Sequence, residues 1–232
     1  MEDRPAAEGR IIMMNPVFGS DVARAGAVAA SVALAGLLLL TLIVTRDWTA
    51  GFDRMTLKAF AALRGPVPDA FFQAVTWLGS SYVLIPSVFL AMVLLAARRQ
   101  WASASLVGLT YFGASLTTWL LKTAVGRERP LLHAMLAEIA PADWSFPSGH
   151  ATHAAAFALG LWLVAARYRP RWRVPSGVVL GGLVLLVSAS RLHLQVHWPS
   201  DVLAGWLVAV FWAGIAYAAA CRGGGASAGR VA

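Results

Sequence analysis

The chain has 232 residues, of which 59% are hydrophobic and only 13% are charged, and its formal net charge is +8. Soluble domains carry about 25% charged residues, so this composition excludes an ordinary soluble domain. The positive charges lie between long apolar segments, which leaves nucleic-acid binding without support beyond the total charge.

Six apolar segments predict an all-α fold, an integral membrane bundle of six transmembrane helices. They are 25–44, 77–97, 101–121, 151–166, 174–189 and 202–221. The fourth and fifth segments are shorter than about 20 residues, so they need flanking residues or local thinning of the bilayer to span it. The expected domains are a cytoplasmic N-terminal segment (1–24), the membrane domain (25–221) and a disordered C-terminal tail (222–232).

The charges flanking these segments predict their orientation. The first segment is a retained anchor, because no small-residue cleavage site follows it. Arg98, Arg99 and the arginines of 167–173 lie in short loops on the same side as both termini, and the positive-inside rule puts that side in the cytoplasm. We therefore expect a multi-pass protein of the inner (plasma) membrane. Its outer (periplasmic or extracellular) side carries the loops 46–76, 122–150 and 190–201.

The first outer loop contains a pattern with a helical repeat. Phe52, Met55, Ala59 and Leu63 fall near one face of a helix over 51–64, and the charged residues do not. This pattern predicts a short helix lying in the membrane interface, with a plain polar connection as the alternative.

Three cationic residues from two outer loops form a candidate anion-binding cluster: Lys122, Arg129 and Arg191. Charges close to lipid are costly and are therefore often functional. Each of them alone is equally compatible with a side chain that snorkels to the interface. Arg127, in the same loop as Arg129, is assigned no role.

The four residues before the fourth segment are Pro147, Ser148, Gly149 and His150. Ser148 is expected to cap the helix, and Gly149 allows a ligand to approach the backbone closely. The free amides and the dipole at such a helix start attract an anion, most naturally a phosphate. A simple capped helix start is the alternative; in the phosphate-binding interpretation, His150 lies beside the anion.

His197 and Asp201 are four residues apart at the start of the sixth segment, so they share a helix face and can meet. Pro199 is tolerated there because it falls in the first turn. A carboxylate bonded to one ring nitrogen leaves the other nitrogen as a good nucleophile or base. A structural pair that caps the helix is the alternative.

Together these residues predict a phosphoryl-transfer site that uses no metal or other cofactor. The cations hold the phosphate oxygens, His197 attacks phosphorus, and His150 protonates the leaving oxygen. Water then hydrolyses the phosphohistidine, with His150 as the base. A phosphotransferase that passes the phosphoryl group to a lipid or alcohol acceptor fits the same residues.

A metal hydrolase is a weaker alternative, in which His193, His197 and Asp201 line one helix face as ligands. Nearby arginines and Pro199 argue against it. A non-catalytic lipid-binding protein is disfavoured because every residue that the chemistry needs is present. His133 and His153 are interpreted as interfacial or packing residues.

The clusters resemble the three motifs of the type 2 phosphatidic acid phosphatase superfamily, which also includes vanadium haloperoxidases and some bacterial acid phosphatases. The motifs are Lys-x6-Arg-Pro, Pro-Ser-Gly-His and Ser-Arg-x5-His-x3-Asp, and all are complete between Lys122 and Asp201. The resemblance implies that His197 is the nucleophile, Asp201 its partner and His150 the acid and base. It also implies phosphate contacts from Lys122, Arg129, Ser148, Gly149 and Arg191.

The membrane members of that superfamily act on lipid phosphates and diphosphates, generally without metal. The small size and short loops resemble bacterial phosphatidylglycerophosphate and undecaprenyl pyrophosphate phosphatases. We therefore expect a polyprenyl diphosphate or a glycerolipid phosphate as substrate and membrane lipids as surroundings, with a lipid A phosphate less favoured. The apolar loop 131–146 either admits such a lipid sideways or simply lies at the interface. The sequence does not indicate an oligomeric state.

Overall fold

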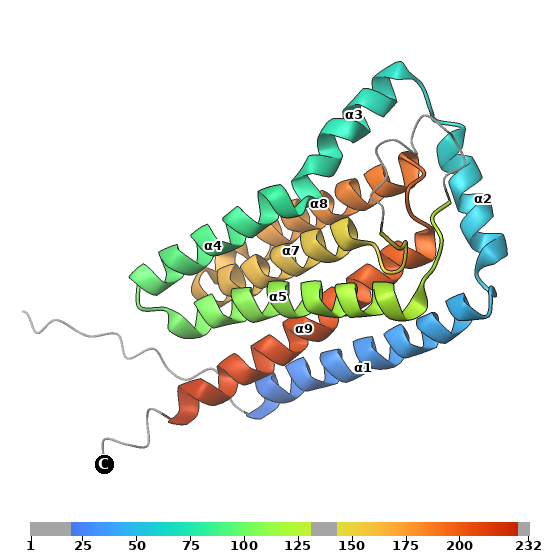
Figure 1. Cartoon of the computed structure of the whole chain (residues 1–232). Coiled ribbons are helices and arrows are strands. Elements are labelled where there is room, and N and C mark those ends of the chain that lie inside the picture. Colours follow the sequence, from blue (N-terminus) through green and yellow to red (C-terminus); the bar gives the residue numbers. More distant parts are fainter. Residues whose placement is uncertain (1–19, 131–142, 227–232) are drawn as a thin grey trace, which may run out of the picture.

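The computed structural model describes residues 20–130 and 143–226, and these residues form helices and no strand (Figure 1). The prediction of an all-α fold is confirmed. The long helices are α1 (Ser20–Thr45), α4 (Ser81–Ala97), α5 (Trp101–Val125), α7 (Gly149–Tyr168), α8 (Arg173–His193) and α9 (Pro199–Ala226). The shorter ones are α2 (Ala50–Ala61), α3 (Pro66–Thr76), η1 (Trp77–Gly79) and η2 (Pro170–Trp172).

Among the described residues, six helical segments are long and apolar enough to cross a membrane. They begin earlier or end later than the sequence predicted, because polar residues at their ends are also helical. The two short predicted segments become Gly149–Tyr168 and Pro170–His193. The second span begins at Pro66, because α3 and η1 lead into α4.

The terminal regions differ from the predicted boundaries in a similar way. The first helix begins at Ser20 and the last continues to Ala226, so both extend beyond the predicted 25–221 domain. Residues 1–19 and 227–232, which include most of the predicted N-terminal segment and part of the predicted disordered tail, lie outside the described residues.

Helix α9 lies at the centre of the bundle and packs against α1, α5 and α7 (Figure 1). Helix α7 also contacts α5 and α8, while α4 packs on α5 and α3 packs on α8. Close approach of α1 and α9 depends on two glycines. A Cβ at Gly26 would lie 2.9 Å from the carbonyl oxygen of Gly214, and a Cβ at Gly214 would lie 2.6 Å from that of Gly26.

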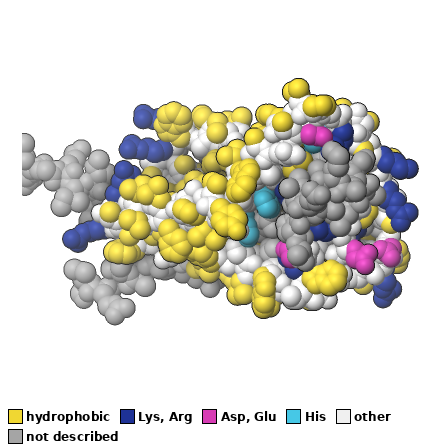
Figure 2. Space-filling view, turned by 45° about the horizontal axis from the view of Figure 1, so that its top comes forward, with side chains coloured by type: hydrophobic (Ala, Val, Ile, Leu, Met, Phe, Trp, Pro, Cys, Tyr) yellow, Lys and Arg dark blue, Asp and Glu magenta, His cyan; other side chains and the backbone are white. Residues whose placement is uncertain are grey.

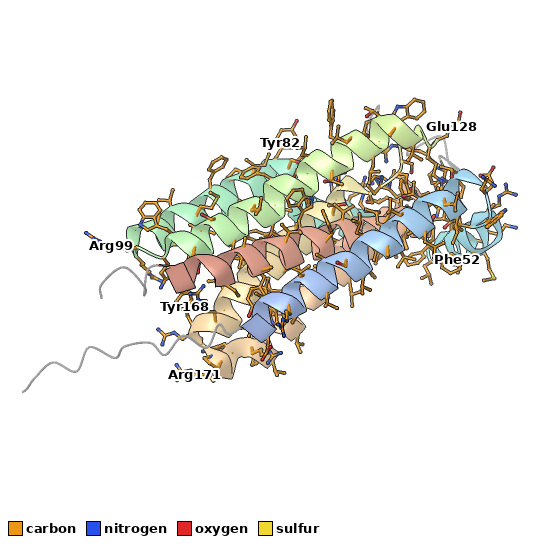
Figure 3. All side chains as sticks on the ribbon, turned by 90° about the horizontal axis from the view of Figure 1, so that it is seen from below. Phe52, Tyr82, Arg99, Glu128, Tyr168 and Arg171 are labelled. Atoms are coloured by element: carbon orange, nitrogen blue, oxygen red, sulfur yellow. The ribbon has the colours of Figure 1, made fainter. Side chains whose placement is uncertain are left out.

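The outside of the bundle is apolar, as a lipid-facing surface requires. Large hydrophobic side chains are exposed along the long helices, including Leu38, Val93 and Val178. Figure 2 shows apolar side chains over the middle of the bundle and basic side chains toward both ends. The two ends carry different loops: Arg99, Tyr168 and Arg171 lie at one end, and Phe52 and Glu128 at the other (Figure 3).

The predicted helix is present as α2, although it ends at Ala61 rather than at residue 64, and its place in the membrane interface stays a prediction. Two of its large apolar residues face outward, with Phe52 51% and Met55 67% exposed, while Leu57 packs inward. Asp53 is on the opposite side and is completely buried. A charged residue of α2 therefore points into the end of the bundle where α7 and α9 begin.

Candidate active site

The predicted site residues gather at this end of the bundle. A cavity of about 240 Å³ lies among the ends of α4, α5 and α7. Its walls include Lys122, Arg129, Gly149, His150 and His197. These residues come from three sequence motifs up to 75 positions apart, and the fold brings them to one cavity.

Two side-chain oxygens lie close to Nδ1 of His197. Its Nδ1 lies 3.4 Å from Oδ2 of Asp201 and 3.3 Å from Oγ of Ser145. The Ser145 hydroxyl donates to the same carboxylate oxygen over 2.5 Å. The predicted His197–Asp201 pair therefore forms, but not on one helix face, because α9 begins at Pro199, after His197.

The contacts of His197 define its tautomer. Nη1 of Arg129 lies 3.1 Å from Nε2 of His197, and a guanidinium group can only donate hydrogen bonds. Nε2 is therefore the acceptor, and the ring proton is on Nδ1, facing Ser145 and Asp201. An unprotonated nitrogen that faces the cavity beside a cation is suited to attack an electrophilic phosphorus.

The charge state of His197 follows from the same surroundings. Burial, then the positive charges of Arg129, Arg191 and Lys122, hold the pKa of His197 well below its ordinary value of 6.5. Burial disfavours a charged imidazole, and nearby cations repel one. The ring is therefore neutral at neutral pH, which is the form a nucleophile requires.

Asp201 is completely buried, and its carboxylate accepts several hydrogen bonds. Besides Ser145, it accepts hydrogen bonds from the backbone N–H of Trp198 at 2.8 Å and from Nη1 of Arg127 at 2.6 Å. Such bonds fix the orientation of the carboxylate that faces His197.

Arg127, to which the sequence assigned no role, connects Asp201 to helix α2. Its Nη2 lies 2.7 Å from Oδ2 of Asp53, which also accepts a hydrogen bond from the hydroxyl of Ser200. The backbone N–H of Ser200 donates to the other oxygen of Asp53 at 3.0 Å. The start of α9 is thereby tied to α2 through two buried carboxylates and one guanidinium group.

The Pro-Ser-Gly-His motif forms the start of α7, as predicted, but Ser148 does not cap the helix with its side chain. Its Oγ is buried without a hydrogen-bond partner in the described part of the chain. The backbone N–H of Ser148 instead donates to the carbonyl oxygen of Asp201 at 3.0 Å. Gly149 faces the cavity, because the nearest atom to a Cβ built there would be Cε1 of His153, 4.0 Å away.

Two of the predicted phosphate-binding cations already hold an anion. Asp143 lies 3.1 Å from Nζ of Lys122 and 2.5 Å from Nη2 of Arg129. Lys122 also donates to the carbonyl oxygen of Trp144, and Arg129 to that of Val196 at 2.7 Å. A carboxylate thus occupies the place where these cations would meet a phosphate oxygen.

Arg191 lies on the other side of His150. It lines an adjoining cavity of about 420 Å³, whose walls also include His150 and Thr76. Its Nη1 donates to the Thr76 hydroxyl at 2.6 Å, while its buried Nε has no hydrogen-bond partner among the described residues. Both cavities contact His150 and Ser81, so His150 stands between Arg191 and the other two cations.

In the described part of the chain, His193 does not join His197 and Asp201 as the alternative metal site requires. His193, at the end of α8, bonds Oδ1 of Asp69 at 2.7 Å and stacks on Phe72, whose ring centre is 4.4 Å away. It is not on one helix with His197 and Asp201, and no group of three candidate ligands occurs among the described residues. His153 lines the cavity around His197, and its Nδ1 lies 3.3 Å from Oγ of Ser81. His133 lies outside the described residues.

The fold and the site define a class: a multi-pass helical membrane protein with a histidine–carboxylate pair beside a cationic cavity. Comparison with known proteins identifies the family. The PAP2 superfamily model matches residues 103–222, more than half of the chain, and the chain therefore belongs to this family. The prediction of the type 2 phosphatidic acid phosphatase superfamily is confirmed.

Named relatives support the same assignment. An undecaprenyl-diphosphatase of Sulfolobus acidocaldarius is 34% identical over 56% of this chain and 60% of the relative. The phosphatidylglycerophosphatase B of Bacillus subtilis is 28% identical over 73% of this chain and 83% of the relative. These relatives are named as lipid phosphatases, so the predicted enzyme class is confirmed at the level of the family.

The fold has a counterpart among solved structures. A transmembrane PAP2-type phosphatidylglycerolphosphate phosphatase of Bacillus subtilis superposes with a TM-score of 0.73. The match covers 88% of this chain and 98% of that protein at 22% identity. At this identity the likeness concerns the fold, and it supports a helical bundle that spans a membrane.

Proposed function

We propose that this protein is a metal-independent lipid phosphatase that works through a phosphohistidine intermediate on His197. The observation that carries the proposal is the orientation of this residue. Its unprotonated Nε2 faces the cavity beside Arg129, while Nδ1 faces Ser145 and Asp201. A neutral, oriented imidazole beside cations suits attack on a bound phosphate.

In the first step, Nε2 of His197 attacks phosphorus, and the bond between phosphorus and the leaving lipid oxygen breaks. His150 donates a proton to that oxygen. The ring of His197 becomes positively charged as the N–P bond forms. Asp201, assisted by Ser145 and Arg127, holds the Nδ1–H and stabilises that charge.

In the second step, water attacks the phosphorus of the phosphohistidine. His150, now unprotonated, accepts a proton from the water, the N–P bond breaks, and inorganic phosphate leaves. The enzyme returns to its starting state with neutral His197. If a lipid or alcohol replaces water in this step, the product is a new phosphate ester, and the protein is a phosphotransferase.

The cations take the part that a divalent metal has in many phosphoryl transfers. In this proposal Lys122, Arg129 and Arg191 bind the non-bridging oxygens and offset the charge that spreads over them in the transition state. Ser148 and Gly149 add the first turn of α7, whose free N–H groups and dipole favour an anion.

The proposed substrates are a polyprenyl diphosphate or a glycerolipid phosphate, which the names of the two relatives support. The proposed location is the inner (plasma) membrane, with both termini in the cytoplasm and the cavity facing outward. The separation of Arg99 and Arg171 from Glu128 along the bundle supports this orientation (Figure 3). Labelling of an Arg169→Cys variant by an impermeant maleimide outside intact cells would contradict it.

The test is phosphate release by detergent-purified protein with excess EDTA, from a panel of polyprenyl diphosphates and glycerolipid phosphates. His197→Ala, compared in parallel, should lower the rate at least about 10⁴-fold. With labelled substrate, wild type should form an acid-labile phosphoprotein that His197→Ala does not. Near-normal phosphate release by His197→Ala would exclude His197 as the nucleophile. Phosphate release that EDTA abolishes would exclude the metal-free mechanism. Formation of a new phosphate ester with an added alcohol, without release of inorganic phosphate, would favour the phosphotransferase.

A further inference from the structure

A further cavity, far larger than the one at His197, opens on the lipid-facing side of the bundle. It is a groove of about 630 Å³ between α7, α8 and α9. It extends from Ala155 and Trp206 near the middle of the bundle to Arg173 at the start of α8. It shares no lining residue with the cavity around His197, so the proposed chemistry makes no use of it.

Two glycines of α8 leave part of this groove without side chains. Gly177 and Gly181, one helical turn apart, both line the groove. A Cβ at Gly177 would lie 3.0 Å from Nε1 of Trp162, and a Cβ at Gly181 would have no atom within 4 Å. The space beside Gly181 is thus open and bordered by apolar side chains such as Val178 and Leu185.

The groove has a cation at one end. Arg173 is exposed, its guanidinium group lies 5.9 Å from the ring centre of Trp162, and it forms no ion pair within the described ranges. It also lines a neighbouring cavity of about 390 Å³ that extends to α1. None of the described residues that line these two cavities carries a carboxylate, and the exposed Arg169 and Arg171 lie close by in the chain.

An apolar groove that ends at unpaired positive charge matches a molecule with an apolar chain and a negative head. We propose that the groove binds an anionic phospholipid, with an acyl chain along Gly177 and Gly181 and the phosphate at Arg173. Bulk lipid is as apolar as the groove, so the acyl chain alone provides little selectivity. The charge of the headgroup therefore decides which lipid binds, because cationic residues at this depth attract anionic headgroups.

The test compares two neighbouring glycines of α8. A Cβ at Gly181 or at Gly182 would have no atom within 4 Å, but only Gly181 lines the groove. Gly181→Leu should fill the groove without a clash, and Gly182→Leu is the matched control for the change in helix propensity and surface. Arg173→Gln removes the cation and keeps the groove.

Each variant is purified in detergent and titrated with phosphatidylglycerol or with phosphatidylcholine of the same chains, followed by native mass spectrometry and thermal unfolding. Phosphatidylglycerol should bind wild type and Gly182→Leu and raise their melting temperatures. Binding should be lost in Gly181→Leu, and Arg173→Gln should bind roughly fivefold more weakly. Release of phosphate from a soluble ester checks that every variant is folded.

Three outcomes would overturn the proposal. If Gly181→Leu binds phosphatidylglycerol as wild type does, the lipid binds outside the groove. Equal binding of the two lipids by wild type would show that charge does not select the occupant. A dimer that dissociates only in Gly181→Leu would show that the groove holds a second copy of the chain. None of these outcomes depends on the identity of the enzyme's substrate.

Discussion

Arg127 and Asp201 form a buried ion pair with 2.6 Å between Nη1 and Oδ1, directly behind the proposed nucleophile. The other nitrogen of the same guanidinium group contacts Asp53 of α2 at 2.7 Å. Helix α2 is thereby coupled to the orientation of His197 through a chain of charged groups. Arg127 touches neither His197 nor the cavity in this arrangement, and we infer that it positions Asp201.

Asp53→Asn tests this coupling. The variant keeps the shape of the side chain but leaves Arg127 with one carboxylate in place of two. Loss of one member of a buried charge network costs about 3 to 5 kcal/mol at most, so the melting temperature should fall. Arg127 is then held less firmly beside Asp201, so the orientation of Asp201 is less well fixed. We therefore expect kcat to fall roughly tenfold or more, with KM little changed. Steady-state kinetics and thermal unfolding measure both effects.

Asp69→Asn is the matched control. Asp69 forms an ion pair with Arg64 and a hydrogen bond with His193 near the same end of the bundle, but it does not contact Asp201. This variant should lose stability while keeping kcat near that of wild type. An equal fall of kcat in both variants would show that general loosening of this end of the bundle, and not the connection through Arg127, explains the effect.

The features that were predictable from sequence are those whose signal is local in the chain. Apolar runs predicted the spanning helices, and the spacing from His197 to Asp201 predicted their contact. Arg127 and Asp53 are 74 residues apart, and their pairing depends on how α2 packs against α9. The one available clue was Asp53 itself, a charge on the opposite side of α2 from Phe52 and Met55.

Helix ends and side-chain partners were predicted less well. Ser148 was expected to cap α7, but its N–H bonds Asp201 and its hydroxyl is left without a partner in the described segments. Ser145, which bonds Asp201, lies just before the motif and has no spacing that distinguishes it from a loop serine. Such contacts follow from three-dimensional packing, which a motif does not encode.

Asp143→Asn tests whether this carboxylate competes with the substrate. Burial raises the pKa of Asp143, but Lys122 and Arg129 together lower it by more. The resulting pKa lies below its ordinary value of 3.8. The carboxylate is therefore negative at neutral pH and repels an incoming phosphate. In the variant, KM and the inhibition constant of inorganic phosphate should fall roughly fivefold, equivalent to about 1 kcal/mol.

The opposite result would assign Asp143 another role. If the carboxylate serves mainly to hold Lys122 and Arg129 in place, its removal should raise KM instead. Asp47→Asn, which removes a carboxylate outside this cavity, controls for the change in net charge near the site.

His150→Ala tests the proposed proton donor. The variant should release phosphate from lipid esters about 10² to 10⁴ times more slowly, because an alkoxide is a poor leaving group without a proton. A nitrophenyl phosphate needs no such proton, so its first turnover should be slowed far less. The first turnover is the correct comparison, because His150 also serves the second step. Equal losses on both substrates would contradict donation to the leaving group.

Low pH should destabilise the protein through His197. Its pKa in the folded state is well below 6.5, held down by burial and by Arg129, Arg191 and Lys122, whereas the unfolded chain has an ordinary pKa. Below about pH 6.5 the unfolded state binds a proton that the folded state does not. The free energy of unfolding therefore falls, by up to about 1.4 kcal/mol per pH unit from this group.

Thermal unfolding of wild type and His197→Gln between pH 8 and pH 5 measures this contribution. The melting temperature of the variant should fall less steeply below pH 6.5, because the titrating group is gone. Parallel curves would show that His197 is not held neutral by its surroundings.

Gly205→Ala should disturb the site through packing alone. A Cβ at Gly205 of α9 would lie 2.7 Å from Oγ1 of Thr152 and 3.0 Å from the carbonyl oxygen of Ser148. The start of α7 must then move away from α9, which stretches the 3.0 Å bond from Ser148 N–H to the Asp201 carbonyl oxygen. We expect a loss of about 1 to 3 kcal/mol in stability together with a clear fall in kcat.

Gly36→Ala separates this packing effect from the effect of removing a helical glycine. A Cβ at Gly36 of α1 would meet only the side chain of Leu207, at 3.5 Å, which is an ordinary contact. Alanine is favoured over glycine in a helix by about 1 kcal/mol, so this variant should be at least as stable as wild type and equally active. Because both substitutions add the same methyl group, a Gly205→Ala enzyme as active as Gly36→Ala would show that catalysis tolerates a shift between α7 and α9.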